Sequence, residues 1–174
     1  MSRQYYKTEG LIIKKTPYGE ADFLVRIFAR DFGKIDVIAR GARKSASKLN
    51  SHLDILNFIR FSFVKNGDRL SILTDAEIIE LFDKWFLTGD KVAFVHRIIK
   101  TIDMVIPQEE ADNELLKQVI IFLRSCVNFD LNKDYTQFLR WILSHEGYGS
   151  KIDLKTLPQE LADGIMKLWP VSTI

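Results

Sequence analysis

Residues 23–40, with the sequence FLVRIFARDFGKIDVIAR, decide the fold class of this chain. Apolar residues recur at every second position over 23–30 and again over 35–40, and Gly33 lies in the short connection between the two runs. A period of two is typical of β-strands, because neighbouring side chains point to opposite faces of a sheet. The stretch therefore predicts two strands joined by a tight turn.

The same alternation continues on both sides of this stretch. Further strand-like runs occupy residues 9–15, 56–64 and 69–74. Asn66-Gly67-Asp68 between the last two runs is a hairpin signal. We expect a turn over residues 16–20, where proline and glycine occur, and one short helical turn within residues 47–53. The first part of the chain therefore carries five predicted strands.

Near residues 75–85 the period changes to that of a helix. Apolar residues three and four positions apart are typical of one face of an α-helix. Three such stripes consist of Val92, Val95, His96, Ile99, Ile102 and Ile106, then Leu115, Leu116, Val119, Ile120, Leu123 and Val127, then Tyr135, Phe138, Leu139, Ile142 and Leu143. We expect Gly147 to stop the third helix and a fourth to begin at Pro158 and end near Leu168. The predicted fold class is α+β, with a β-barrel over residues 1–80 and an α-helical domain over residues 81–174.

The composition is that of a folded protein. Of the 174 residues, 47% are hydrophobic and 28% charged, which excludes the disordered classes. Cys126 is the single cysteine, so an internal disulfide and a multi-cysteine zinc site are excluded. No apolar run reaches the length of a membrane helix, and the N-terminal sequence MSRQYYKTEG lacks the apolar core of a signal peptide. We expect a cytoplasmic protein with no membrane partner.

Positive charge is concentrated in the first part of the chain. Residues 1–70 hold 14 Lys and Arg against 7 Asp and Glu, whereas residues 71–174 hold 11 against 16. The stretch 37–53 contains no acidic residue at all. Among its small residues, which let a phosphate approach the backbone, it carries Arg40, Arg43, Lys44, Lys48 and His52. This pattern favours a polyanionic partner such as a nucleic acid, and a solvated basic loop is the alternative.

Strand periodicity also predicts which side chains face a ligand. The odd-numbered residues from 23 to 29 and from 35 to 39 are apolar and should face the barrel interior. The outer face should carry Leu24, Arg26, Phe28, Arg30, Asp36, Ile38 and Arg40. Single-stranded nucleic acid needs such a mixture, with cations for phosphates and a flat ring for stacked bases. Alternatively, Phe28 packs under the helical domain and the arginines lie at its rim.

Several short motifs resemble the RecO family of bacterial recombination mediators. They are Thr8-Glu9-Gly10-Leu11-Ile12, Gly19-Glu20-Ala21-Asp22, Gly33-Lys34-Ile35, the ARGARKS sequence of residues 39–45, and Leu73-Thr74-Asp75-Ala76-Glu77. The resemblance spans residues 8–82 and implies a five-stranded OB-fold barrel followed by an α-helical domain. Residues 138–143 and Gly147-Tyr148 resemble the family helix that precedes a frequent zinc module. Because no cysteine follows Cys126, we expect a zinc-less member that is shortened at its C-terminus.

The resemblance implies a function without catalysis. It implies binding of single- and double-stranded DNA, annealing of complementary strands, contacts with RecR and single-strand-binding protein, and assistance in loading RecA. Such a protein is expected to be cytoplasmic and associated with the nucleoid. The expected DNA-binding residues are Arg40, Arg43, Lys44, Lys48, Lys34, Arg26, Arg30 and Phe28. The alternative is an OB-fold adaptor that binds RNA or a ribonucleoprotein.

Enzyme signatures in the chain are weak. The three histidines share no ligand motif, and no phosphate-binding glycine loop or nucleophile elbow occurs. Ser144-His145-Glu146 cannot form a triad by itself, because adjacent side chains on a helix diverge. Glu20 and Asp22 could pair on a metal, but a hydrogen-bonding role at the start of a strand is favoured. We expect no catalytic residue, no metal and no cofactor.

Overall fold

The structure, a computed structural model, describes residues 3–67, 69–82, 89–125, 131–147 and 164–165. The chain forms two compact units. The barrel unit comprises residues 1–83 together with residues 107–117, and the helical unit comprises residues 84–106 and 118–174. The assignment of one domain to residues 1–80 and a second to 81–174 stays a prediction.

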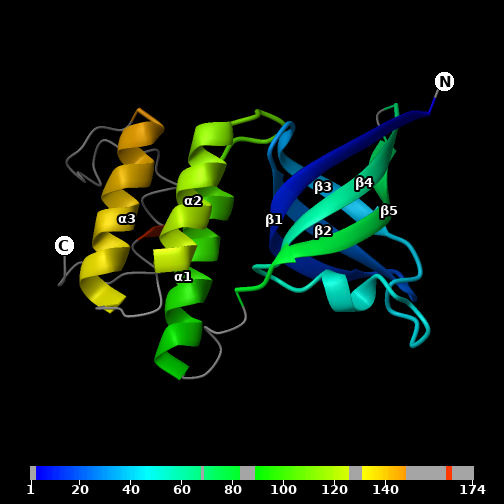
Figure 1. The fold of residues 1–174 in the computed structure, drawn as a ribbon, viewed down its shortest axis with the longest axis horizontal. Coiled ribbons are helices and arrows are strands. Elements are labelled where there is room, and N and C mark those ends of the chain that lie inside the picture. The colour runs from blue at the N-terminus through cyan, green and yellow to red at the C-terminus, as the bar shows by residue number, and fades with distance from the viewer. Residues whose placement is uncertain (1–2, 68, 83–88, 126–130, 148–163, 166–174) are drawn as a thin grey trace. The chain divides into compact units, whose positions relative to one another are not determined.

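Five strands of the described residues close into a barrel with the order β1-β2-β3-β5-β4 (Figure 1). They are β1 (Gln4–Tyr18), β2 (Asp22–Ala29), β3 (Gly33–Ala39), β4 (Phe58–Asn66) and β5 (Arg69–Glu80). Neighbouring strands are antiparallel except β3 and β5, which are parallel from Val37 paired with Ser71 to Ala39 paired with Leu73. The expected helical turn is present as the 3₁₀ helix η1 (Asn50–His52). The predicted five-stranded OB-fold barrel followed by helices is confirmed.

Two strands are longer than the sequence pattern predicts. One end of β1 pairs with β4 and the other with β2, and both pairings include Gly10 and Leu11. Because residues 16–18 pair with β2, they are extended, and the turn expected over residues 16–20 is wrong for these three residues. The chain turns at residues 19–21 instead, where Gly19 has a φ of +58°. Similarly, β5 continues to Glu80 alongside β4.

The barrel core confirms the predicted inward face of β2 and β3. Its members include Val25, Ile27, Ala29, Ile35, Val37 and Ala39, all buried. Phe23 is partly buried and packs against this cluster. β4 and β5 contribute Ile59, Phe61, Phe63, Leu73 and Ala76. The interior is therefore filled with apolar side chains, and a polar ligand would have to bind on the outer face or the loops.

Three helices lie among the described residues after the barrel strands: α1 (Gly89–Val105), α2 (Asn113–Ser125) and α3 (Leu131–His145). The stripe residues whose burial the structure describes are buried, except His96 of the first stripe, which is exposed. Gly147, with a φ of +85°, follows the end of α3 as expected. The predicted fourth helix, apart from residues 164–165, lies outside the described residues. No helix in the described ranges is long and apolar enough to cross a membrane.

The segment of residues 107–112, between α1 and α2, belongs to the barrel unit. The Glu109 backbone N–H donates to the Lys34 carbonyl at 3.0 Å, and Gln108 forms a parallel bridge with Lys34. The Lys65 ammonium lies 3.4 Å from a Glu109 carboxylate oxygen. The segment therefore adds backbone pairing to the first half of β3, which β5 does not reach.

Candidate nucleic-acid interface

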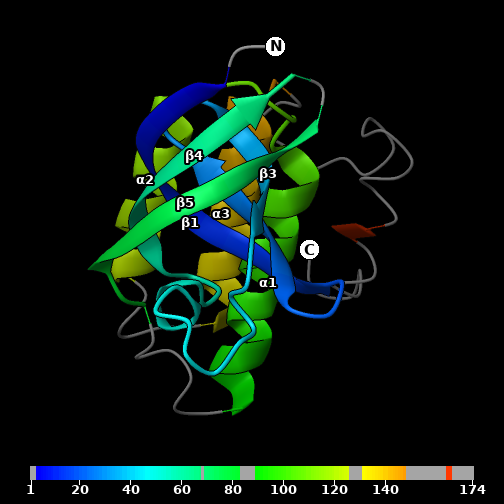
Figure 2. The ribbon, with the colours of Figure 1, turned by 90° about the vertical axis from the view of Figure 1, so that its right-hand side faces the viewer.

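The loop of residues 40–48, called here the basic loop, leaves the end of β3 and is bonded to the β1–β2 turn. Gly41 donates its backbone N–H to the Asp22 carboxylate at 2.7 Å, and Arg43 donates its backbone N–H to the Ala21 carbonyl at 2.9 Å. The Arg43 guanidinium donates to the Gly19 carbonyl at 2.9 Å. Figure 2 shows the turn and the loop at the same end of the barrel. These bonds hold the loop in place without using a cation–carboxylate pair.

Asp22 thereby has the hydrogen-bonding role that the sequence favoured over a metal ligand. Its acceptor Oδ1 fixes Gly41, whose φ of +67° is in the left-handed region that glycine adopts at low cost. The chain can therefore turn sharply directly after Arg40. This local geometry places Arg40 and Arg43 on either side of the anchored residues 41–42.

Four cations of the basic loop are exposed: Arg40, Arg43, Lys44 and Lys48. Within the described part of the chain, none of them forms a salt bridge with an Asp or Glu side chain. An exposed cation without an acidic partner keeps its full charge available to a phosphate. The loop thus combines concentrated positive charge with a backbone of small residues at positions 41, 42, 45, 46 and 47.

Two other expected contact residues, Arg26 and Arg30, are engaged by carboxylates. Arg26 pairs with Asp36 through two hydrogen bonds, Nε to Oδ1 at 2.7 Å and Nη2 to Oδ2 at 2.8 Å. Arg30 lies 2.6 Å from a Glu9 oxygen, and Arg60 binds the same carboxylate at 2.9 Å. A phosphate would have to compete with these carboxylates, so the two arginines are weaker candidates than the basic loop.

The expectation that Phe28 presents its ring on the outer surface is wrong, because Phe28 is fully buried. Lys34, its register partner on β3, is also buried, with 8% of its surface exposed. Other parts of the chain cover the outer face of the barrel here, and at Lys34 the 107–112 segment pairs with the backbone. Neither residue can offer a free surface to a nucleic acid in this arrangement.

Sequence reasoning missed Tyr18, which it treated as part of a turn. Tyr18 is the last residue of β1 and is 44% exposed. The only signal in the sequence was its position directly before Gly19-Glu20-Ala21-Asp22, the turn to which the basic loop is bonded.

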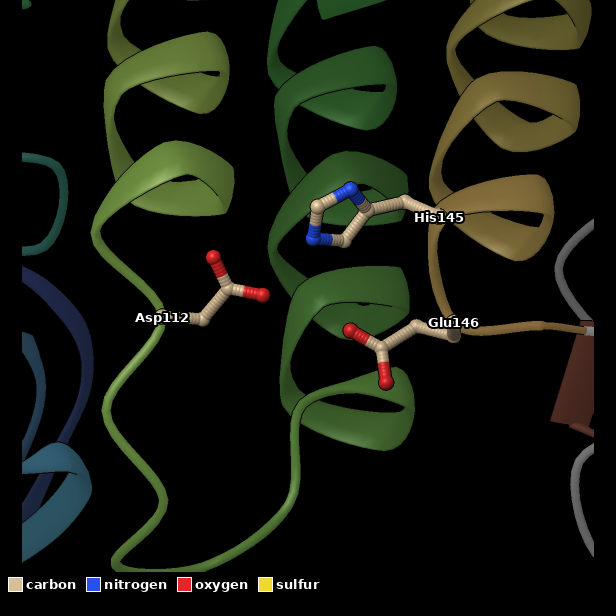
Figure 3. Close-up of side chains that lie close together, drawn as sticks. All are labelled: Asp112, His145 and Glu146. Carbon is tan, nitrogen blue, oxygen red and sulfur yellow. The ribbon is translucent and has the colours of Figure 1, made fainter.

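A group of Asp112, His145 and Glu146 contains the side-chain types that bind metals (Figure 3). Asp112 has a structural role in the barrel unit, since its carboxylate accepts the Leu115 backbone N–H at 2.8 Å and caps α2. His145 and Glu146 stand at the end of α3, in the helical unit. Because the group is divided between the two units, we assign no ligand to it.

The closed five-stranded barrel with this strand order is an OB fold. Residues 1–82 match the family model described as "Recombination protein O N terminal". The matched residues 1–82 are therefore similar to the N-terminal part of the RecO family, as the motifs indicated.

Curated relatives support the same assignment. The chain is 26% identical over 139 residues to the DNA repair protein RecO of Thermodesulfovibrio yellowstonii, covering 78% of this chain and 54% of the relative. It is 31% identical over 118 residues to the DNA repair protein RecO of Listeria monocytogenes serotype 4a, covering 68% of this chain and 46% of the relative. For the protein of the same name from Halalkalibacterium halodurans the identity is 28% over 130 residues, covering 73% and 51%. The chain spans about half the length of the curated relatives it matches.

Proposed function

We propose that this chain is a DNA-binding protein of recombinational repair that binds single-stranded DNA through the basic loop and anneals complementary strands. The observation that carries the proposal is the set of four exposed cations, Arg40, Arg43, Lys44 and Lys48, in a loop with no acid and no acidic partner among the described residues. The proposed role needs no bond-breaking chemistry and therefore no catalytic residue.

Annealing by such a loop has a direct physical basis. Two DNA strands repel each other through their phosphates until cations of the protein replace the condensed counterions. Binding also raises the local concentration of the strands, which favours their encounter. Because the contacts are made to phosphates, the chain should bind single- and double-stranded DNA with little sequence preference.

The relatives supply the biological setting of the proposal. Several of them carry the name DNA repair protein RecO. The resemblance of the motifs implies assistance in RecA loading and contacts with RecR and single-strand-binding protein. We extend these roles to this chain as part of the proposal, with a cytoplasmic, nucleoid-associated location. The contact residues for the partner proteins are not assigned.

The affinity for single-stranded DNA should depend steeply on salt. If about four phosphates are neutralised, the logarithm of the binding constant should fall with the logarithm of salt concentration with a slope of roughly −3. Fluorescence anisotropy of a labelled oligo(dT) between 50 and 300 mM NaCl measures this slope. A binding constant that does not change over this range would contradict the proposal.

The same titration with an RNA of matched length tests the adaptor alternative. A protein that recognises RNA would read the 2′-hydroxyl groups and bind RNA more tightly at every salt concentration. The DNA proposal expects oligo(dT) to bind at least as tightly as oligo(U), and a clear preference for RNA would favour the adaptor.

A further inference from the structure

Tyr18 is an exposed aromatic residue whose side chain has no partner among the described residues. Its exposed fraction is 44%, and within the described residues its hydroxyl makes no hydrogen bond and its ring contacts no other ring. By contrast, Tyr6 on the same strand bonds Gln4 and packs against Phe32 and Phe63. Tyr6 is thus explained by packing, whereas Tyr18 leaves an aromatic face open to solvent.

The register places Tyr18 on the outer face of the barrel. Tyr18 pairs with Asp22, and directly opposed residues of an antiparallel pair point to the same side. Asp22 shares that side with Leu24, because Phe23 and Val25 point inward to the core. The ring therefore lies on the surface that faces a ligand and not in the barrel.

Two hydrogen bonds of the site link the residues beside Tyr18 to the basic loop. Its register partner Asp22 accepts the Gly41 N–H, and its chain neighbour Gly19 accepts the Arg43 guanidinium. An aromatic ring beside phosphate-binding cations is the combination that single-stranded nucleic acid requires, since its bases are free to stack. Glu20 is the exposed acid of the same turn, so we expect phosphate contacts at the basic loop and a base contact at Tyr18.

We propose that Tyr18 is a stacking platform for one base of the single-stranded DNA whose phosphates bind the basic loop. This inference rests on the proposed function. It assigns to Tyr18 the aromatic role that the sequence gave to Phe28, which is buried. The platform distinguishes single strands from duplexes, because bases in a duplex are already stacked on one another.

The test compares two oligonucleotides with equal numbers of phosphates, oligo(dT) and an abasic strand of the same length. The wild-type chain should bind oligo(dT) more tightly than the abasic strand. Tyr18→Ala should weaken binding of oligo(dT) roughly 5- to 100-fold, leave binding of the abasic strand unchanged, and leave the salt dependence unchanged. Tyr18→Phe should retain the wild-type affinity, since the ring and not the hydroxyl makes the contact.

Tyr5 offers a matched control, because it is 71% exposed and lies near the opposite end of β1. Tyr5→Ala should leave both affinities unchanged, and melting temperatures should confirm that the variants fold. An unchanged affinity of Tyr18→Ala for oligo(dT), or an equal loss for both strands, would overturn the stacking role alone. Failure of the wild-type chain to bind either strand would overturn both this inference and the proposed function.

Discussion

Gly33→Ala is expected to cost the protein much of its stability. Gly33 has a φ of +63°, and a Cβ added to it would lie 2.0 Å from the Glu110 carbonyl oxygen and 2.4 Å from the carbonyl carbon. Both atoms are backbone, so the 107–112 segment would have to leave β3. The conformation alone costs about 1–3 kcal/mol for a residue with a side chain, and the clash adds to it. Since the free energy of unfolding of a typical domain is about 5–15 kcal/mol, the total loss is a large share of the stability.

Urea denaturation of the full chain measures this loss, and Gly19→Ala is its matched control. Gly19 has nearly the same backbone conformation, with a φ of +58°, but no heavy atom of the described residues lies within 4 Å of an added Cβ. The stability lost by Gly19→Ala should therefore be limited to the conformational cost. The difference between the free energies of unfolding of the two variants measures the effect of the clash between residue 33 and the 107–112 segment. Equal losses for the two variants would show that the segment does not hold the position described.

The triple variant R40E/R43E/K44E is expected to lose nearly all affinity for single-stranded DNA. At about 0.1 M salt each phosphate contact contributes about 0.7 logarithmic units relative to 1 M salt, so three lost contacts weaken binding roughly 100-fold. Repulsion between the new carboxylates and the phosphates adds to this. Exposed substitutions of this kind usually change stability by less than about 0.5 kcal/mol each. Loss of the Arg43 guanidinium bond to the Gly19 carbonyl costs about 1 kcal/mol more, so the variant should stay folded with a moderately lower melting temperature.

A control variant carries the same change of charge on the helices. Lys100 on α1, Lys117 on α2 and Arg140 on α3 are all exposed. K100E/K117E/R140E should keep most of the affinity if the basic loop binds the DNA. Comparable losses in the two triple variants would indicate that only the total charge of the protein matters.

The strand pattern predicted the barrel interior well, because burial on that side depends on alternation within each strand. The inward residues Val25, Ile27, Val37 and Ala39 are all in the core. The outer face was harder to predict, because its burial depends on distant parts of the chain. Phe28 and Lys34 are both buried, and the 107–112 segment that pairs with Lys34 is distant in the sequence, so the local alternation of residues does not predict that contact.

The basic loop was predictable for a different reason. The absence of acid over residues 37–53 is a property of composition, and it ensures that no acid within the loop neutralises its cations. Arg26 and Arg30 do pair with acids, because Asp36 and Glu9 lie beside them on the neighbouring strands β3 and β1. Only the register of the strands reveals those pairs. The sequence likewise does not reveal that Tyr18 lies near the basic loop, because this depends on its pairing with Asp22 and on the hydrogen bond from Gly41 to Asp22.

The most direct test of the central claim is a titration of the uniformly ¹⁵N-labelled full chain with oligo(dT), followed by two-dimensional amide NMR. If the basic loop binds the DNA, the largest shift changes should fall on the amides of residues 18–22 and 40–48, and they should diminish as salt is raised. Shift changes confined to α1, α2 and α3, with the amides of residues 40–48 unaffected, would contradict the account.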